Sequence, residues 1–172
     1  MKIHWSVLAA TDFFTVEVAT IRGLVTFYVL FVIDIATRRV EIAGVTTHPN
    51  SAFMAQCARQ LTDACDGFLT DKRYLIHDRD SKYTSQFDRI LCDAGIKAIR
   101  LPPRSPNLNS YAERFVRSIK DDVLYHLIIM NERSLRYVLK EYLTHYHTER
   151  NHQGLGNKLI EPRKSRNSTQ LP

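Results

Sequence analysis

The longest apolar run of the chain, Leu24–Ile33, most constrains what the chain can fold into. It lies within the segment LVTFYVLFVIDIA, residues 24–36, whose side chains are almost all apolar. The run has about half of the ~20 residues that a membrane-spanning helix needs. Because consecutive residues are apolar, both faces of a strand built from it would need cover. The run therefore predicts a buried β-strand in a sheet flanked by helices, and no membrane segment.

The order of the other patterns predicts a single α/β domain. Residues 5–18 and 37–47 are rich in β-branched or alternating side chains, so we expect them to form an antiparallel meander with the apolar run. A helix, a strand, a helix, a strand and two helices should follow, which makes a mixed five-stranded sheet with parallel strands in its later part. The expected helices are 51–68, 85–95, 111–127 and 132–147, and the expected later strands are 73–78 and 96–101. Asn131 is the expected N-cap of the last helix. The domain is expected to span residues 1–156, with a polar tail over 157–172 that is loose or lies on a partner.

Composition and charge exclude few functions. The 172 residues suffice for one well-packed domain, and 44% hydrophobic with 24% charged residues is ordinary for a globular protein. The net charge of +6 is compatible with a polyanionic partner and equally with a basic domain that binds no nucleic acid. Cys57, Cys65 and Cys92 form no Cys-x-x-Cys pair and are odd in number. They predict reduced thiols in a cytosolic protein rather than a disulfide framework or a zinc site.

Three carboxylates stand where a structural explanation is incomplete. Asp12 lies inside an apolar strand, where an unpaired carboxylate is costly to bury. Asp78 lies at the carboxyl end of a short strand, and Glu113 lies in the first turn of a helix. Taken singly, Asp12 could pair with a buried arginine, Asp78 could cap a turn, and Glu113 could favour a helix N-terminus. Taken together, they could converge on one hard cation.

Basic residues surround the third carboxylate. Arg117 and Lys120 follow Glu113 at positions that share its helix face. Between residues 97 and 120 the chain has six basic residues and a single acid, Glu113. A solvated helix face would more often mix the two signs. The pattern therefore favours a metal ligand set in a phosphate-binding surface.

At these residues the chain resembles the catalytic core of DDE transposases and retroviral-type integrases, within the ribonuclease H-like superfamily, and in particular bacterial insertion-sequence transposases. The resemblance is carried by four segments in order, and 34 residues separate Asp78 from Glu113, a spacing close to that of the family. It extends over about Trp5 to Pro162. The matching segments are ATDFF (10–14), HDRDSKYTSQF (77–87), SPNLNSYAERFVRSIK (105–120) and YHTERNHQGL (146–155).

The resemblance implies a ribonuclease H-like fold and a metal-dependent reaction on DNA. Asp12, Asp78 and Glu113 would be the catalytic, metal-binding triad, with two Mg²⁺ or Mn²⁺ ions in the active complex. The reaction would be cleavage of a mobile element's ends, followed by attack of the freed 3′-hydroxyl on target DNA. The family more often has glycine where Asp80 stands, so Asp80 is interpreted as a turn residue, although a local shift would let it substitute for Asp78.

The resemblance also implies partners. These are DNA, both the element's terminal repeats and the target, and further copies of the chain, at least a dimer on DNA. Lys120 and Arg117 would hold the DNA end, and Lys97, Arg100 and Arg104 would hold the backbone more loosely. Asn109 stands where the family has asparagine. No helix-turn-helix or zinc finger precedes Trp5. Recognition of specific ends is therefore expected from a preceding part of the protein or from another chain.

Two other functions remain open, and several polar residues favour structural roles. The site would also suit a ribonuclease H-like nuclease that cuts without joining, or the chain could be a catalytically silent DNA-binding or assembly subunit. His77 is interpreted as a strand-end residue, and Asp34 as a cap of the turn after the second strand. The histidines at 145, 147 and 152 are not interpreted as a zinc cluster. His147 and His152 lie within the YHTERNHQGL segment, which is interpreted as C-terminal packing with possible DNA contact.

Overall fold

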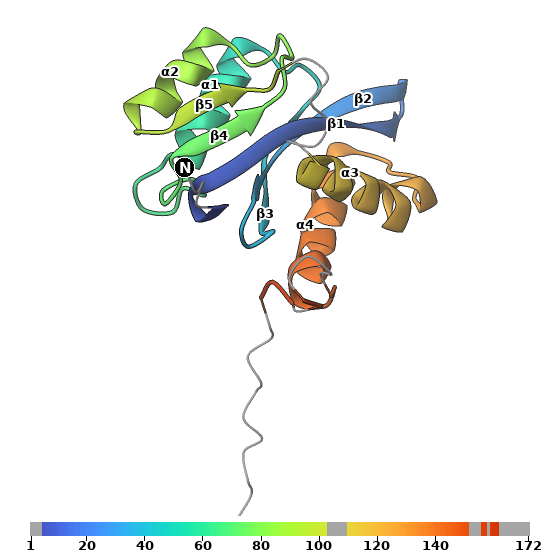
Figure 1. The fold of residues 1–172 in the computed structure, drawn as a ribbon. Helices are drawn as coiled ribbons and strands as arrows, with labels where there is room; N and C mark the ends of the chain where they lie inside the picture. Colours follow the sequence, from blue (N-terminus) through green and yellow to red (C-terminus); the bar gives the residue numbers. More distant parts are fainter. Residues whose placement is uncertain (1–4, 103–109, 152–155, 158, 162–172) are drawn as a thin grey trace, which may run out of the picture.

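The computed structural model describes residues 5–102, 110–151, 156–157 and 159–161 (Figure 1). The order of strands and helices is the one predicted from the sequence. Along the chain, the elements are η1 (Trp5–Val7), β1 (Leu8–Thr20), β2 (Gly23–Asp34), β3 (Val40–Thr46), α1 (Ser51–Leu61), β4 (Tyr74–His77), α2 (Ser85–Asp93), β5 (Lys97–Arg100), α3 (Ser110–Asp122), η3 (Leu124–His126) and α4 (Glu132–Thr148).

The described strands form one mixed sheet in the order β3-β2-β1-β4-β5. The pairs β1–β2 and β2–β3 are antiparallel, whereas β4 runs parallel to both β1 and β5. The predicted meander followed by parallel strands is thus confirmed. Only the first part of β1 pairs with β4, where Ala10 lies opposite Ile76. The later part of β1 continues beyond β4 as a long hairpin with β2.

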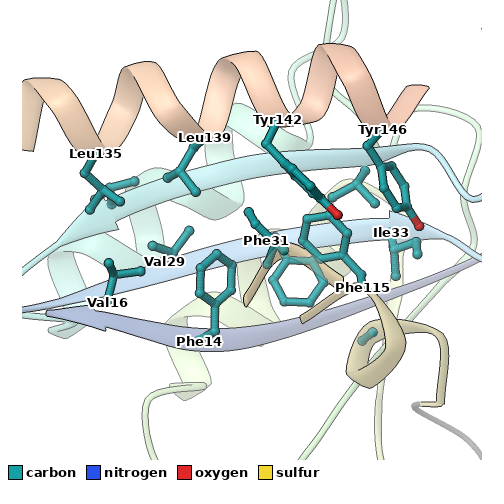
Figure 2. Close-up of a cluster of buried hydrophobic side chains, with 14 of the residues drawn as sticks. Phe14, Val16, Val29, Phe31, Ile33, Phe115, Leu135, Leu139, Tyr142 and Tyr146 are labelled. Atoms are coloured by element: carbon teal, nitrogen blue, oxygen red, sulfur yellow. The ribbon is translucent and has the colours of Figure 1, made fainter. Parts of the chain in front are cut away.

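The apolar run of β2 is covered on both faces, as its sequence predicts. Val29, Phe31 and Ile33 pack with side chains of α3 and α4 (Figure 2). The intervening Leu30 and Val32 pack with α1 and α2 on the opposite face. Each layer is well buried, and Figure 1 shows the two helix pairs on opposite sides of the sheet. The sheet therefore forms the centre of the domain, with a packed layer on each face.

Two helices end earlier than the sequence predicts. The helix expected over 51–68 ends at Leu61, because the Asp63 side chain accepts the N–H of Cys65 and so holds a local turn. The helix expected over 111–127 ends at Asp122. Beyond it the chain turns back to the sheet, where the carbonyl of buried Ile129 accepts the N–H of Ala19 at 2.7 Å. The cap predicted for α4 is confirmed, since Asn131 accepts the N–H of Ser134.

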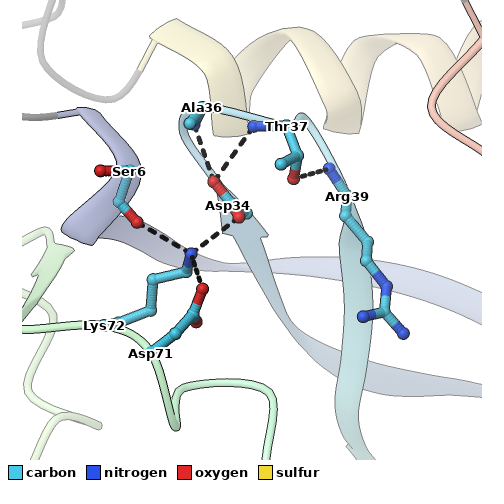
Figure 3. Close-up of polar contacts among 7 residues, drawn as sticks. All are labelled: Ser6, Asp34, Ala36, Thr37, Arg39, Asp71 and Lys72. Carbon is cyan, nitrogen blue, oxygen red and sulfur yellow. Dashed lines mark hydrogen bonds and ion pairs between the residues drawn. The ribbon is translucent and has the colours of Figure 1, made fainter.

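Asp34 caps the turn after β2 and also takes part in a buried ion pair (Figure 3). One carboxylate oxygen accepts the N–H groups of Ala36 and Thr37, which confirms the predicted cap. The other oxygen lies 2.8 Å from Nζ of Lys72, a buried lysine that also donates to Ser6 and Asp71. Burial alone would raise the pKa of Asp34, but the hydrogen bonds from Lys72 and the turn outweigh burial and lower it. Lys72 therefore links three parts of the chain: η1 through Ser6, the end of β2 through Asp34, and its own segment before β4.

The last described residues contact the domain. Ile160 packs against the core formed with α3 and α4, and Glu161 donates its N–H to the carbonyl of His147 at 2.8 Å. Residues 158 and 162–172 lie outside the described residues, so the domain boundary near 156 stays a prediction. Among the helices of the described chain, none is long and apolar enough to cross a membrane. Cys57 is buried, whereas Cys65 and Cys92 are exposed.

Candidate active site

Asp12 occupies a core-facing position of β1. Side chains alternate along a strand, so every second residue of β1 lies on the face covered by α3 and α4. On that face Asp12 stands between Ala10 and Phe14. From residue 8 to residue 18 the other members of this row are buried and apolar: Leu8, Ala10, Phe14, Val16 and Val18. Its Oδ1 accepts the N–H of Phe13 at 2.7 Å. The half-buried carboxylate is therefore placed by the strand itself.

The environment of Asp12 raises its pKa from 3.8 to about 6. Burial is the largest cause, because it disfavours the charged carboxylate. The negative charges of Asp78, Glu113 and Asp80 raise the pKa further, whereas the hydrogen bond from Phe13 lowers it. The fold thus brings the three predicted triad members close enough for their charges to interact.

Asp78 comes out of the sheet beside Asp12. It directly follows β4, whose parallel pairing with β1 sets Ile76 opposite Ala10. The carboxyl ends of parallel strands are the usual place for functional side chains in such sheets. Oδ1 of half-buried Asp78 accepts the N–H of Asp80 at 3.0 Å, so Asp78 also caps the turn that follows β4. The capping interpretation and the ligand interpretation are therefore compatible.

Asp80 is engaged within its own turn. Its Oδ1 accepts the N–H of Lys82 at 2.9 Å, and its Oδ2 lies 2.6 Å from Nζ of the same lysine. Burial acts to raise the pKa of Asp80, but the contacts with Lys82 outweigh it and lower the pKa. This pairing accords with the interpretation of Asp80 as a turn residue. The choice between Asp78 and Asp80 as a ligand stays a prediction.

Glu113 is carried by the first turn of α3. The helix is fixed by buried Ala112, Phe115 and Ile119, and the rings of Phe115 and Phe31 lie 4.8 Å apart. Phe31 is the residue of β2 that pairs with Asp12. The same packing that anchors α3 thus places the exposed Glu113 on the side of the sheet that Asp12 faces.

The predicted DNA-contacting residues have different surroundings. Arg117 is exposed and Lys120 half-buried on α3, after Glu113. Arg100, the last residue of β5, is exposed but pairs with Asp88 at 2.6 Å. Arg104 and Asn109 lie outside the described residues. The structure contains no DNA, so the contacts of these residues with DNA stay predictions.

The chemistry of the carboxylates fits a hard divalent cation. Oxygen ligands alone are what Mg²⁺ prefers in proteins, and the repulsion felt by Asp12 is what a cation would relieve. In the part of the chain that the structure describes, no three histidine, cysteine, aspartate or glutamate side chains are close enough to hold a metal ion. The triad residues are thus neighbours that interact electrostatically but are not yet gathered at ligand distances.

Sequence reasoning missed Tyr83. Its buried ring lies 4.2 Å from the His77 ring and 5.9 Å from that of Phe13. Burial raises its pKa well above the usual value, and the charges of Asp12 and Asp78 add to this. Its position within the segment SKYTSQF is the only sequence signal that could have indicated it.

The C-terminal histidines take structural roles where they are described. Nε2 of His147 accepts the N–H of Val40 at 3.0 Å, and His145 pairs with Glu149. The nearby Tyr146 is buried in the core, and Arg150 pairs with Asp122 at the end of α3. His152 lies outside the described residues. The packing interpretation of YHTERNHQGL is thus supported for these residues.

Comparisons with known proteins identify the fold. Residues 94–159 match the family model of the integrase core domain, and this segment contains Glu113 but not Asp12 or Asp78. The catalytic core domain of BIV integrase superposes with a TM-score of 0.61, covering 90% of this chain and 91% of that one at 18% identity. The chain has an integrase catalytic core fold. This confirms the predicted resemblance and the predicted mixed sheet with flanking helices.

Two further structures share this integrase core fold. The catalytic core domain of HTLV-2 integrase, solved in complex with magnesium in a dimeric form, has a TM-score of 0.63 and 10% identity, covering 90% of this chain and 93% of that one. A chain of the simian T-cell lymphotropic virus intasome, in complex with PP2A regulatory subunit B56 gamma, has a TM-score of 0.65 and 13% identity. The match covers 92% of this chain but only 55% of the intasome chain. No curated protein matches the sequence.

Proposed function

We propose that this chain is the catalytic core of a DNA transposase or integrase of the bacterial cytoplasm. It would cleave the ends of a mobile element and join the freed 3′-hydroxyl to target DNA. Asp12, Asp78 and Glu113 would hold Mg²⁺ or Mn²⁺. The protein would act as a homo-oligomer, at least a dimer on DNA. The HTLV-2 integrase core, which shares the fold, has been solved in dimeric and trimeric forms.

One observation carries the proposal. A carboxylate, Asp12, interrupts the buried row of β1, and its pKa rises to about 6 through burial and through the charges of Asp78 and Glu113. Charge repulsion of this kind lowers the stability of the fold. A purely structural role therefore gives no reason for a carboxylate at position 12. A functional site does give one, because perturbed pKa values cluster where binding and catalysis need them.

The residues would divide the chemistry among them. When bound, a pair of divalent ions would stabilise the charge on the attacking and leaving oxygens of an in-line displacement at phosphorus. Asp12 and Asp78 would share these ions, and Glu113 would complete one coordination shell, which requires the three carboxylates to close up from their present spacing. Arg117 and Lys120 would neutralise DNA phosphates next to the site.

Two alternatives share the same fold. A nuclease would use the same carboxylates with water alone and would not join strands. A silent DNA-binding or assembly subunit would need none of them, and the presence of Asp12, Asp78 and Glu113 together argues against it. Joining activity therefore separates the proposal from the nuclease, and any metal-dependent cleavage separates both from a silent subunit.

The test is a strand-transfer assay. Labelled duplexes carrying candidate terminal repeats are incubated with supercoiled plasmid and Mn²⁺, and both shortened and joined products are measured. The proposal expects joined products that disappear in Asp12→Asn and Glu113→Gln and persist in the exposed-site control Asp93→Asn. Cleavage without joining for every end sequence supplied would favour the nuclease. Cleavage that survives both triad substitutions would overturn the proposal.

A further inference from the structure

His77, the last residue of β4, is a buried polar residue directly before Asp78. Its side chain has no exposed surface, although histidine is only of intermediate burial in most proteins. The ring lies against Tyr83, with centroids 4.2 Å apart, and edge-on to Phe87 at 6.5 Å. A polar ring enclosed in this way needs a polar partner to offset its burial.

The partner of His77 is the backbone of the next residue. Nδ1 lies 2.7 Å from the carbonyl oxygen of Asp78. Because a carbonyl oxygen can only accept, Nδ1 must carry the proton in this contact. The side chain of His77 thus fixes the peptide unit that joins Asp78 to Arg79.

The other nitrogen makes no such contact. Nε2 of His77 lies 3.8 Å from Oδ1 of Asp88, which is beyond hydrogen-bond distance. Neither atom has a hydrogen-bond partner among the described residues. Asp88 is turned instead to Arg100, 2.6 Å away. The contact of Nδ1 with Asp78 is therefore the polar role that the geometry assigns to this ring.

The backbone around Asp78 is held from the other side as well. The carbonyl of His77 accepts the N–H of Leu101 at 2.9 Å, and Nε of Arg79 donates to the carbonyl of Leu101 at 3.0 Å. These contacts hold the peptide units before and after Asp78. The direction of its carboxylate then depends mainly on the side-chain torsions of Asp78 itself. A displacement of the peptide after Asp78 would move the carboxylate relative to Asp12.

We propose that His77 is a positioning residue, whose Nδ1–H holds the backbone of Asp78 so that its carboxylate faces Asp12 and can share a divalent ion. This inference rests on the proposed function, because it takes Asp78 as a ligand. It assigns His77 no contact with metal or DNA. Hydrogen-bonded supports of ligands typically change metal affinity or activity by about 10- to 100-fold when removed.

The two nitrogens can be tested separately. His77→Asn keeps a donor near the place of Nδ1, His77→Gln places one nearer Nε2, and His77→Phe keeps the ring without any nitrogen. Free Mn²⁺ is measured by electron paramagnetic resonance as metal is added to each folded variant without DNA, so the readout does not depend on activity. Urea unfolding with chelator present reports any general loss of stability. Asp88→Asn is the matched control for the Nε2 side.

The inference expects Mn²⁺ affinity within about threefold of wild type for His77→Asn and Asp88→Asn, and about 10-fold or more weaker for His77→Phe and His77→Gln. The loss of Mn²⁺ affinity must be larger than the fraction of unfolded protein, known from urea unfolding of each metal-free variant, would cause. Wild-type Mn²⁺ affinity in a folded His77→Phe would overturn the inference. Losses of affinity that follow only the stability of the three His77 variants would also overturn it.

The variant Asp78→Asn separates failure of this inference from failure of the proposed ligand role of Asp78. If Asp78→Asn abolishes binding while His77→Phe does not, only this inference fails. If Asp78→Asn has no effect, the proposed ligand role of Asp78 fails and this inference with it.

Discussion

Replacement of Asp12 by asparagine should stabilise the metal-free protein at neutral pH. The charged form of Asp12 is disfavoured in the folded state by burial first and by the charges of Asp78 and Glu113 second. Asparagine has the same shape, keeps an oxygen for the N–H of Phe13 and carries no charge. The substitution therefore removes the cost of the charge while leaving the strand intact.

The expected gain in the free energy of unfolding follows from the shift in the pKa of Asp12. The pKa of Asp12 is raised from 3.8 to about 6, and each tenfold change in proton affinity corresponds to about 1.4 kcal/mol. Below about pH 4 the residue is protonated in both folded and unfolded states, so its charge costs nothing. As pH rises from about 4 to about 6, the unfolded chain ionises first and the folded state loses stability. Above that window the full cost is about 3 kcal/mol.

Urea unfolding with chelator present measures the effect. Asp12→Asn should exceed wild type by about 3 kcal/mol at about pH 7.5 and by about 1 kcal/mol at about pH 4.5. The control Asp93→Asn, at an exposed position, should stay within about 0.5 kcal/mol of wild type at both. A gain that does not depend on pH, or a loss of stability at neutral pH, would refute the reasoning that Asp12 is held charged against its environment.

Three further predictions test other parts of the structure. Asp78→Asn should abolish metal-dependent DNA cleavage while Asp80→Asn retains it, and the reverse result in a cleavage assay would show that the ligand is Asp80. Lys120→Ala should weaken DNA binding more than the control Lys140→Ala on α4. It should also lower the slope of log affinity against log salt by about one. Equal effects of the two substitutions in titrations at several salt concentrations would count against DNA contact by the face of α3 that carries Lys120. Lys72→Met should lower the free energy of unfolding by about 3–5 kcal/mol, because it leaves the buried carboxylate of its partner uncompensated. That loss should shrink in acid as the carboxylate is protonated, and urea unfolding at two pH values would detect it.

The features predicted correctly from the sequence are those set by local pattern. The continuous apolar run of β2 implied cover on both faces, and Asn131 signalled the start of α4 through its own capping chemistry. Asp12 stood out because a strand interior disfavours a charge. In each case, neighbouring residues along the chain contain the physical reason.

The features that the sequence did not reveal depend on contacts between distant segments. Lys72 lies 38 residues from Asp34, and no local pattern marks it as the buried partner. The end of α3 was placed five residues too late, because the apolar character continues to Leu127 although the chain turns back to pair Ile129 with Ala19. The enclosure of Tyr83 likewise depends on three elements meeting in space.

The most direct test of the account is joining of DNA that needs no recognition of specific ends. A branched duplex that presents a 3′-hydroxyl beside a strand junction allows the reverse of strand transfer, so one phosphoryl-transfer step can be followed alone. With Mn²⁺, the wild-type chain should release the branch and reseal the strand, and Asp12→Asn, Asp78→Asn and Glu113→Gln should each abolish the resealed product while remaining folded. Resealing that persists in all three variants, or hydrolysis of the branched DNA without any resealed product, would contradict the claim that these carboxylates form a DNA-joining site.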